Sequence, residues 1–141
     1  MTQRVEGFIA ACGEAGYPIR PRETYRSPER QAWLYGIGRD YDPDGRGNPY
    51  VTNARTGKAG WHAYRLAVDF EDLHGNDPHG ETLATMRACA ATFGLALGAD
   101  WLTPDVPHAQ AVELPKSPDA EDQACYLRDD IAAVADRYGL A

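Results

Sequence analysis

The sequence has few basic residues and no long apolar run. It contains 14 lysine and arginine residues against 21 aspartate and glutamate residues, so its formal net charge is −7. A general binder of nucleic acid or of anionic membranes needs a basic face, and this charge balance argues against both classes. No apolar segment is long enough to span a bilayer, so we expect no membrane span.

Cysteine is also scarce. The three residues, Cys12, Cys89 and Cys125, are odd in number, lie far apart and form no CxxC pair of the kind that binds metals. We expect reduced, partly buried thiols. Near the N-terminus a short apolar patch is interrupted by Gly13 and Glu14, which makes a poor signal peptide. We therefore expect synthesis in the cytoplasm, with another exit route for any action outside the cell.

The 141 residues, of which 43% are hydrophobic, predict one folded domain over residues 1–141. The spacing of apolar residues and the positions of Gly and Pro predict helices over 3–15, from 28 to about 36–38, over 81–93 and over 119–138, an extended segment over 17–26, and short strands over 65–70, 95–101 and 107–114. This order indicates an α+β fold, with helices packed against a small antiparallel sheet. We expect the chain to be a monomer.

A polar loop after the second predicted helix resembles the beginning of a calcium loop. Asp40, Asp42, Asp44 and Gly45 have the required spacing, but the twelfth position of an EF-hand, which needs an acid, is Val51. A solvated turn is the better interpretation.

The stretch AGWHAYRLAVDF places His62 seven positions before Asp69. Residues an odd number apart on a straight strand face opposite sides, so the two side chains converge only if the chain turns or bulges near His62. By itself the pair is weak evidence for a site, because a hydrogen-bonded histidine and an exposed acid are a simpler interpretation.

A second candidate lies in Asp105-Val-Pro-His108. Two histidines and one carboxylate form a ligand set for catalytic zinc that leaves a fourth position for water, and a spare carboxylate nearby could accept the proton of that water. His74 and His79 compete for the ligand role. They lie in a loop rich in Gly, Asn, Asp and Pro, where solvated histidines are common.

These motifs together resemble a known family. HAYRLAVDF is similar to the SxHxxGxAxD motif of the zinc D-alanyl-D-alanine peptidases, which include the vancomycin-resistance dipeptidases and carboxypeptidases and the L-alanyl-D-glutamate endopeptidases of phage endolysins. DVPH resembles the second motif of the endolysin branch. TYRSPERQAWLYGIGR resembles the upstream YRS…Q…LY…GR segment, and VTNA and GADW also fit. The resemblance covers about residues 17–111.

The resemblance implies the roles of five residues. His62, Asp69 and His108 would bind zinc, and Asp105 would be the general base. Arg26 would face the substrate carbonyl and stabilise the developing oxyanion, a role that suits a permanently charged guanidinium.

The implied activity is that of a zinc metallopeptidase acting on the stem peptides of bacterial peptidoglycan, at the L-alanyl-D-glutamate bond or, alternatively, as a D-alanyl-D-alanine carboxypeptidase or dipeptidase. Such an enzyme would act on the cell wall after release. A rival interpretation is a zinc-containing binding domain without turnover, since Sonic hedgehog signalling domains resemble these peptidases in fold.

Two positions depart from the family motif. Gly60 replaces its serine, which removes a hydroxyl, and Arg65 replaces its glycine with a bulky cation. Both changes leave the implied ligands intact and predict an altered substrate preference. We expect Trp101 to support the strand of His108. In the predicted helix after Pro28, the side chains of Gln31, Trp33 and Tyr35 line either a substrate groove or the core.

Overall fold

The computed structural model describes residues 1–40, 42–43 and 57–140. The helices are α1 (Thr2–Glu14), α2 (Pro28–Gly36), α3 (Gly80–Ala90), α4 (Ala120–Leu127) and α5 (Ile131–Arg137), and the strands are β1 (Ile19–Glu23), β2 (Ala67–Asp72), β3 (Leu95–Leu97) and β4 (His108–Ala111). Four 3₁₀ turns complete the described part: η1 (Gly57–Ala59), η2 (Trp61–Tyr64), η3 (Ala91–Phe93) and η4 (Gly98–Asp100). The VTNA segment and most of the calcium-like loop lie outside the described residues.

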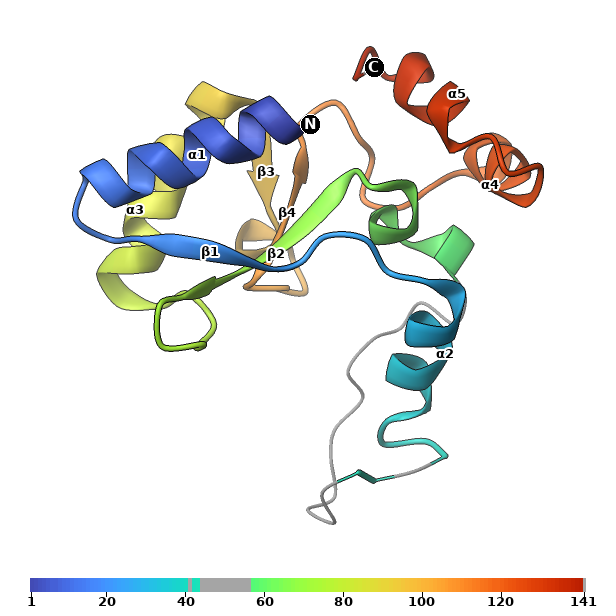
Figure 1. Ribbon diagram of the computed structural model, residues 1–141, viewed down its shortest axis with the longest axis horizontal. Coiled ribbons are helices and arrows are strands. Elements are labelled where there is room, and N and C mark those ends of the chain that lie inside the picture. The colour runs from blue at the N-terminus through green and yellow to red at the C-terminus, as the bar shows by residue number, and fades with distance from the viewer. Residues whose placement is uncertain (41, 44–56, 141) are drawn as a thin grey trace.

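The strands form one antiparallel sheet in the order β1-β2-β4-β3. Figure 1 shows α1 and α3 lying together on one side of this sheet, while α4 and α5 form a separate pair at its other end. The predicted α+β class, with helices packed against a small antiparallel sheet, is confirmed.

The alternation of side chains along β2 divides a core from a site. Val68 and Phe70 are buried together with Phe8 of α1 and Met86 of α3, and the rings of Phe8 and Phe70 meet edge to face with centroids 5.4 Å apart. Burial of each such side chain contributes about 1.5–3 kcal/mol, so this cluster holds both helices on the sheet. Because neighbouring residues of a strand point to opposite faces, Asp69 faces away from this core.

A second hydrophobic cluster holds the C-terminal helices against η2. Trp61 and Tyr64 of η2 are buried with Val134 of α5, and the ring of Trp61 meets that of Tyr138 edge to face at 5.7 Å. The indole Nε1 of Trp61 donates a hydrogen bond to the carbonyl of Pro115 (2.8 Å). Trp61 and Tyr64, on either side of His62 in the chain, therefore anchor the turn that carries it.

The single helix predicted over 119–138 is wrong, because the structure has two helices there. Asp129 adopts a left-handed conformation (φ 59°), which ends α4, and the carboxylate of Asp130 accepts a hydrogen bond from the amide of Ala133 at the start of α5. The apolar stripe continues across the break since both helices face the same core. The helix predicted over 81–93 is likewise shorter, and its last residues form η3.

The second predicted helix is confirmed with its start signals. The hydroxyl of Ser27 accepts a hydrogen bond from the amide of Arg30 (3.1 Å), and Pro28 occupies the first helical position. Among the described residues, none of the helices combines the length and apolar character that crossing a membrane requires.

Candidate metal centre

His62 lies on η2 rather than on a strand. Arg65 ends this turn in a left-handed conformation (φ 61°), and β2 begins two residues later at Ala67. The chain therefore turns between His62 and the strand, as convergence with Asp69 requires. The left-handed backbone also explains why a glycine would suit position 65, because residues with a Cβ enter this region at a cost.

Strand pairing brings Asp69 and His108 together. The two residues lie directly opposite each other in the antiparallel pair of β2 and β4, and opposite residues present their side chains on the same face. Glu23 of β1 lies opposite Asp69 on the other side, beyond a shift in register after Pro21. The face of β2 turned away from the hydrophobic core thus collects the charged groups.

Three buried side chains form the centre of the site. One ligand atom from each of His62, Asp69 and His108 lies within 4.8 Å of the others. The Nε2 atom of His62 is 3.1 Å from Oδ1 of Asp69, and Nδ1 of His108 is 3.5 Å from the same oxygen. The two imidazole rings meet edge to face with centroids 5.2 Å apart.

The remaining ring nitrogens have partners that fix both tautomers. Nδ1 of His62 donates to the carbonyl of Thr24 (3.1 Å), and Nε2 of His108 donates to the amide oxygen of Gln110 (3.0 Å). When neutral, each imidazole therefore directs a lone pair at the ionised Asp69, and only a protonated ring would donate a hydrogen bond to that carboxylate. Three electron-pair donors that converge in a buried space need a cation between them, so this set could hold a metal ion.

The charges at the site respond to one another. Burial alone would raise the pKa of Asp69, but hydrogen bonds from the rings of His108 and His62 in their protonated form outweigh it and hold that pKa far below the usual range. Burial likewise acts to lower the pKa of His108, but its hydrogen bonds to Asp69 and Gln110 raise it overall. Asp69 is thus an ionised carboxylate, ready to bind a cation without first losing a proton.

Asp105 lies beside this centre, in the turn that leads into β4. Its amide donates to the carbonyl of Gly98 (2.9 Å), and its own carbonyl accepts from the amide of His108 (3.1 Å). Loss of hydration raises the pKa of its carboxyl group. The positive charge of His108 lowers that pKa and the negative charge of Asp69 raises it, and the pKa is raised overall. Asp105 is exposed, so solvent screens part of these effects.

Gly98 permits the close approach of this turn. A Cβ at position 98 would overlap the carbonyl oxygen of Asp105 and lie 3.0 Å from Cβ of His108. Gly98 is therefore required because the turn packs closely against η4. Its backbone conformation does not require glycine, since its φ is not positive.

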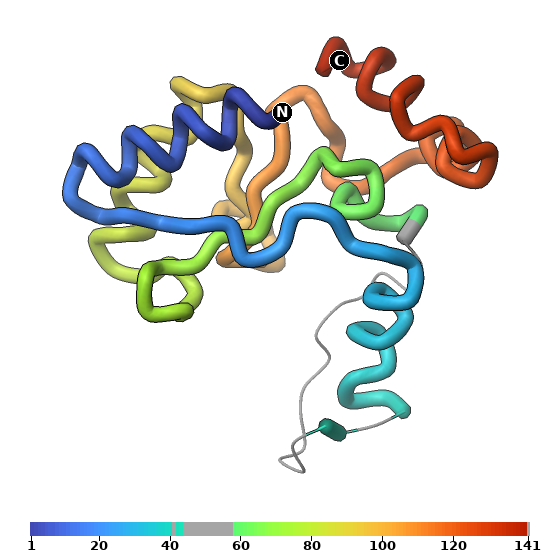
Figure 2. The backbone as a smooth tube through the Cα atoms, viewed as in Figure 1, coloured from blue at the N-terminus to red at the C-terminus, as the bar shows by residue number. Residues whose placement is uncertain are grey.

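Arg26 reaches the centre from the segment between β1 and α2, whose path beside β2 and past η2 is seen in Figure 2. Its Nη2 atom lies 3.4 Å from Oδ2 of Asp69 and 2.6 Å from Oε2 of Glu23, and its Nη1 atom donates to Oε1 of Gln31 (3.1 Å). The amide of Arg26 also donates to the carbonyl of His62 (3.3 Å). The guanidinium is held in one orientation at the rim of the candidate metal centre.

The structure thus brings all five predicted residues together, whereas His74 and His79 lie on the exposed loop after β2 and take no part. Trp101 packs against the ring of His108 with centroids 5.0 Å apart, as expected. Gln31 is buried beside Arg26, while the side chain of Trp33 is 43% exposed.

Sequence reasoning missed Gln110, Thr24, Gly98 and Glu23. Gln110 had a signal, since it follows His108 by two positions on a predicted strand and therefore shares its face. Thr24 and Gly98 begin the TYRSPERQAWLYGIGR and GADW segments that resemble the family, but the resemblance assigned them no role. The roles of the others depend on contacts across the fold.

No protein-family model and no curated protein matches the sequence. Among solved structures, the fold is similar to that of the L-Ala D-Glu endopeptidase ChiX of Serratia marcescens, with 20% identity, coverage of 79% of each chain and a TM-score of 0.53. It is also similar to the L,D-carboxypeptidase DacB of Streptococcus pneumoniae, with 19% identity, coverage of 97% of this chain and 73% of that chain, and a TM-score of 0.54. At these identities the likeness concerns the fold, and it agrees with the fold that the sequence motifs imply.

Proposed function

We propose that this chain is a zinc metallopeptidase that hydrolyses a peptide bond in the stem peptides of bacterial peptidoglycan, with the L-alanyl-D-glutamate bond as the first candidate. One observation carries the proposal: three buried donors converge on one point beside a further carboxylate and an oriented guanidinium. Similarity in fold to an L-Ala D-Glu endopeptidase and an L,D-carboxypeptidase supports a substrate of this class.

Zinc fits the donor set better than magnesium or calcium. His62 and His108 supply imidazole nitrogens and Asp69 supplies one carboxylate, whereas the hard cations prefer oxygen ligands throughout. When bound, zinc supplies a Lewis acid that polarises a carbonyl group and lowers the pKa of a water to about 7.

Asp105 would move the proton in this reaction. It lies outside the three-residue cluster but near enough to feel the charges of both Asp69 and His108. Its carboxylate would accept a proton from the attacking water and then donate it to the amine that leaves. A raised pKa suits this role because an acid–base group works best when its pKa is close to the working pH.

Arg26 would bind the substrate carbonyl as negative charge develops on its oxygen. Glu23 and Gln31 hold the guanidinium in place, so little reorganisation is needed during the reaction. Oriented donors of this kind stabilise a transition state more than a ground state.

A carboxypeptidase acting at the end of the stem peptide is the second candidate, favoured by the similarity to DacB over 97% of this chain. In either case we propose that residues 1–141 act as one zinc peptidase domain on the cell wall after release from the cell.

Mass spectrometry of purified peptidoglycan fragments after incubation with the metal-loaded protein tests the proposal. New N-terminal D-glutamate identifies the endopeptidase, and loss of a terminal D-alanine identifies the carboxypeptidase. Asp105→Asn should keep its metal and lose turnover on the order of 100-fold or more. Unchanged fragments at full zinc occupancy would leave the non-catalytic binding domain as the better interpretation.

A further inference from the structure

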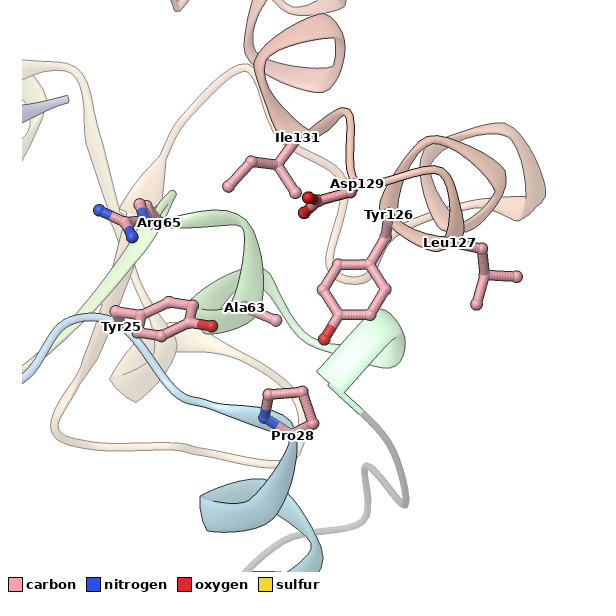
Figure 3. Close-up of a pocket in the computed structure, with 8 residues that line it drawn as sticks. All are labelled: Tyr25, Pro28, Ala63, Arg65, Tyr126, Leu127, Asp129 and Ile131. Atoms are coloured by element: carbon pink, nitrogen blue, oxygen red, sulfur yellow. The ribbon is translucent and has the colours of Figure 1, made fainter.

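A pocket of about 410 Å³ lies between η2, the segment before α2 and the C-terminal helices. Figure 3 shows its walls: Tyr25 and Arg65 on the left, Pro28 below, Ala63 in the middle, and Tyr126 and Asp129 on the side of the C-terminal helices. None of the residues that line the pocket belongs to the cluster of His62, Asp69 and His108.

Two residues that line the pocket adjoin residues of the candidate metal centre in the chain. Tyr25 immediately precedes Arg26, and Ala63 immediately follows His62. The hydrogen bond from the amide of Arg26 to the carbonyl of His62 (3.3 Å) joins these two walls. A substrate held at the metal centre could therefore place a neighbouring side chain in the pocket.

One end of the pocket offers three side-chain groups that can accept hydrogen bonds. In Figure 3 the carboxylate of Asp129 and the hydroxyls of Tyr25 and Tyr126 point toward its middle. In the described part of the chain, none of these three groups forms a side-chain hydrogen bond or ion pair. The pKa of Tyr126 is raised by partial burial and then by the nearby Tyr25, Glu29 and Asp129, which agrees with a cluster of negative character.

This end matches an ammonium group. An alkylammonium carries three N–H donors and a positive charge, and it is also attracted to the faces of aromatic rings. A carboxylate with two tyrosines supplies a counter-charge, acceptors and ring faces together. A neutral apolar group placed there would offer the exposed carboxylate of Asp129 neither a hydrogen-bond donor nor a counter-charge.

The other end carries a cation. The guanidinium of Arg65 stacks over the ring of Tyr25, 4.9 Å from its centroid, and forms no ion pair within the described residues. Figure 3 places it across the pocket from Asp129. Arg65 would repel an ammonium at its own end and attract a carboxylate, so the pocket is charged in opposite senses at its two ends.

We propose that this pocket is a subsite for the alkylammonium group of a diamino acid side chain in the substrate. The inference rests on the proposed function, because stem peptides carry such a residue next to the D-glutamate. Two sources share this chemistry: a lysine side chain, which ends in an ammonium alone, and a diaminopimelate side chain, which ends in an ammonium and a carboxylate. Arg65 favours the second.

Calorimetric binding of short peptides to metal-loaded Asp105→Asn protein, in which turnover is blocked, tests the subsite. The probes are L-Ala-γ-D-Glu-L-Lys, the same peptide with an acetylated side-chain amine, and its diaminopimelate counterpart. Acetylation should weaken binding up to about 5-fold, since Asp129 is exposed and solvent screens the charge pair that is lost. Adding Asp129→Asn should abolish this difference, and asparagine tolerates the left-handed backbone there.

The matched control is Asp136→Asn, which removes the same charge from an exposed position on α5 that does not line the pocket. It should retain the full preference for the free amine. Arg65→Gln should weaken the diaminopimelate peptide and leave the lysine peptide unchanged, and equal weakening of both would overturn the assignment of diaminopimelate.

Failure of the subsite and failure of the proposed function are distinguishable. If the parent protein cleaves the free and acetylated peptides with equal KM, and both bind equally, the ammonium subsite is wrong while the peptidase stands. If the free amine is preferred through Asp129 but the parent cleaves nothing, the subsite stands and the proposed reaction is wrong.

Discussion

The Nε2 atom of His108 donates a hydrogen bond to the amide oxygen of Gln110, 3.0 Å away and two residues further along β4. The amide nitrogen of Gln110 donates in turn to the carbonyls of Leu114 (3.3 Å) and Pro115 (2.8 Å). Since both of these partners are acceptors, the oxygen of Gln110 must face His108. The network therefore directs the other ring nitrogen, Nδ1, toward Asp69.

Gln110→Met should keep the volume of the side chain and remove this network. Loss of a partner that orients a ligating histidine typically lowers metal affinity 10–100-fold. Competition with a chelating dye measures the change. Gln123→Met is the matched control, because Gln123 also donates to a backbone carbonyl but lies on α4, outside the metal cluster. An affinity equal to that of the parent would show that Gln110 has only a structural role.

His62→Ala and His108→Ala should each strip the metal and lower the free energy of unfolding. A ligand that binds only the folded state at 100 times its dissociation constant stabilises it by about 2.7 kcal/mol, and this contribution would be lost. Metal analysis and thermal unfolding with and without chelator check both effects. His74→Ala, on the exposed loop, should change neither, and full zinc occupancy in His108→Ala would remove that residue from the ligand set.

Gly98→Ala should displace the turn that holds Asp105. The added Cβ would overlap the carbonyl oxygen of Asp105, and relief of such overpacking costs about 1–3 kcal/mol. Urea unfolding gives the stability change, and turnover should fall along with it. Gly13→Ala is the control, because its Cβ would meet nothing within 4 Å and the position lies in α1, so stability should rise slightly.

Arg26→Ala should lower kcat by roughly 100-fold, with a smaller change in KM, if the guanidinium acts mainly on the transition state. Arg26→Lys should recover only part of the rate, since an ammonium cannot reproduce the planar set of donors. Steady-state kinetics on a defined stem peptide measures the effect. Arg22→Ala, which breaks an exposed ion pair with Asp77, is the control, and equal losses in both variants would argue against a specific role for Arg26.

Acid should weaken the attachment of α5 to α4. Hydrogen bonds from Arg137 and from the amide of Asp122 hold the pKa of Asp119 well below its usual range. A depressed pKa means that the stabilisation is fully present above about pH 4 and is lost as the pH falls through the lower, folded-state value. Arg137→Gln should flatten this acid-side loss in thermal unfolding profiles, whereas Arg87→Gln, from the exposed pair with Asp100, should leave it unchanged.

The sequence was sufficient to predict the fold class and most elements. Apolar spacing marked α1 and α3, and Ser27 with Pro28 marked the start of α2, because caps and periodicity are local properties of the chain. The same local signal could not reveal the break at Asp129. Helices α4 and α5 present one continuous apolar stripe, so their spacing looks like that of a single helix.

The five candidate site residues were also predicted from the sequence, but only through the resemblance of several motifs to a known family. Without that resemblance, the residue types and spacing of His62 and Asp69 were only weak evidence for a site. Tertiary structure decided the geometry: the left-handed turn at Arg65 moves His62 off the strand, and the register of β2 with β4 sets Asp69 opposite His108. Register depends on which strands pair, and pairing is a property of the whole fold.

The pocket beside the metal centre was decided by tertiary structure alone. Tyr25, Arg65 and Asp129 come from segments separated by 40 and 64 positions in the chain, and no local pattern links them. The sequence determined that each of these side chains is polar or charged. The C-terminal helices pack against η2 through a hydrophobic core that does not include these three residues. That packing alone placed the three side chains around one space.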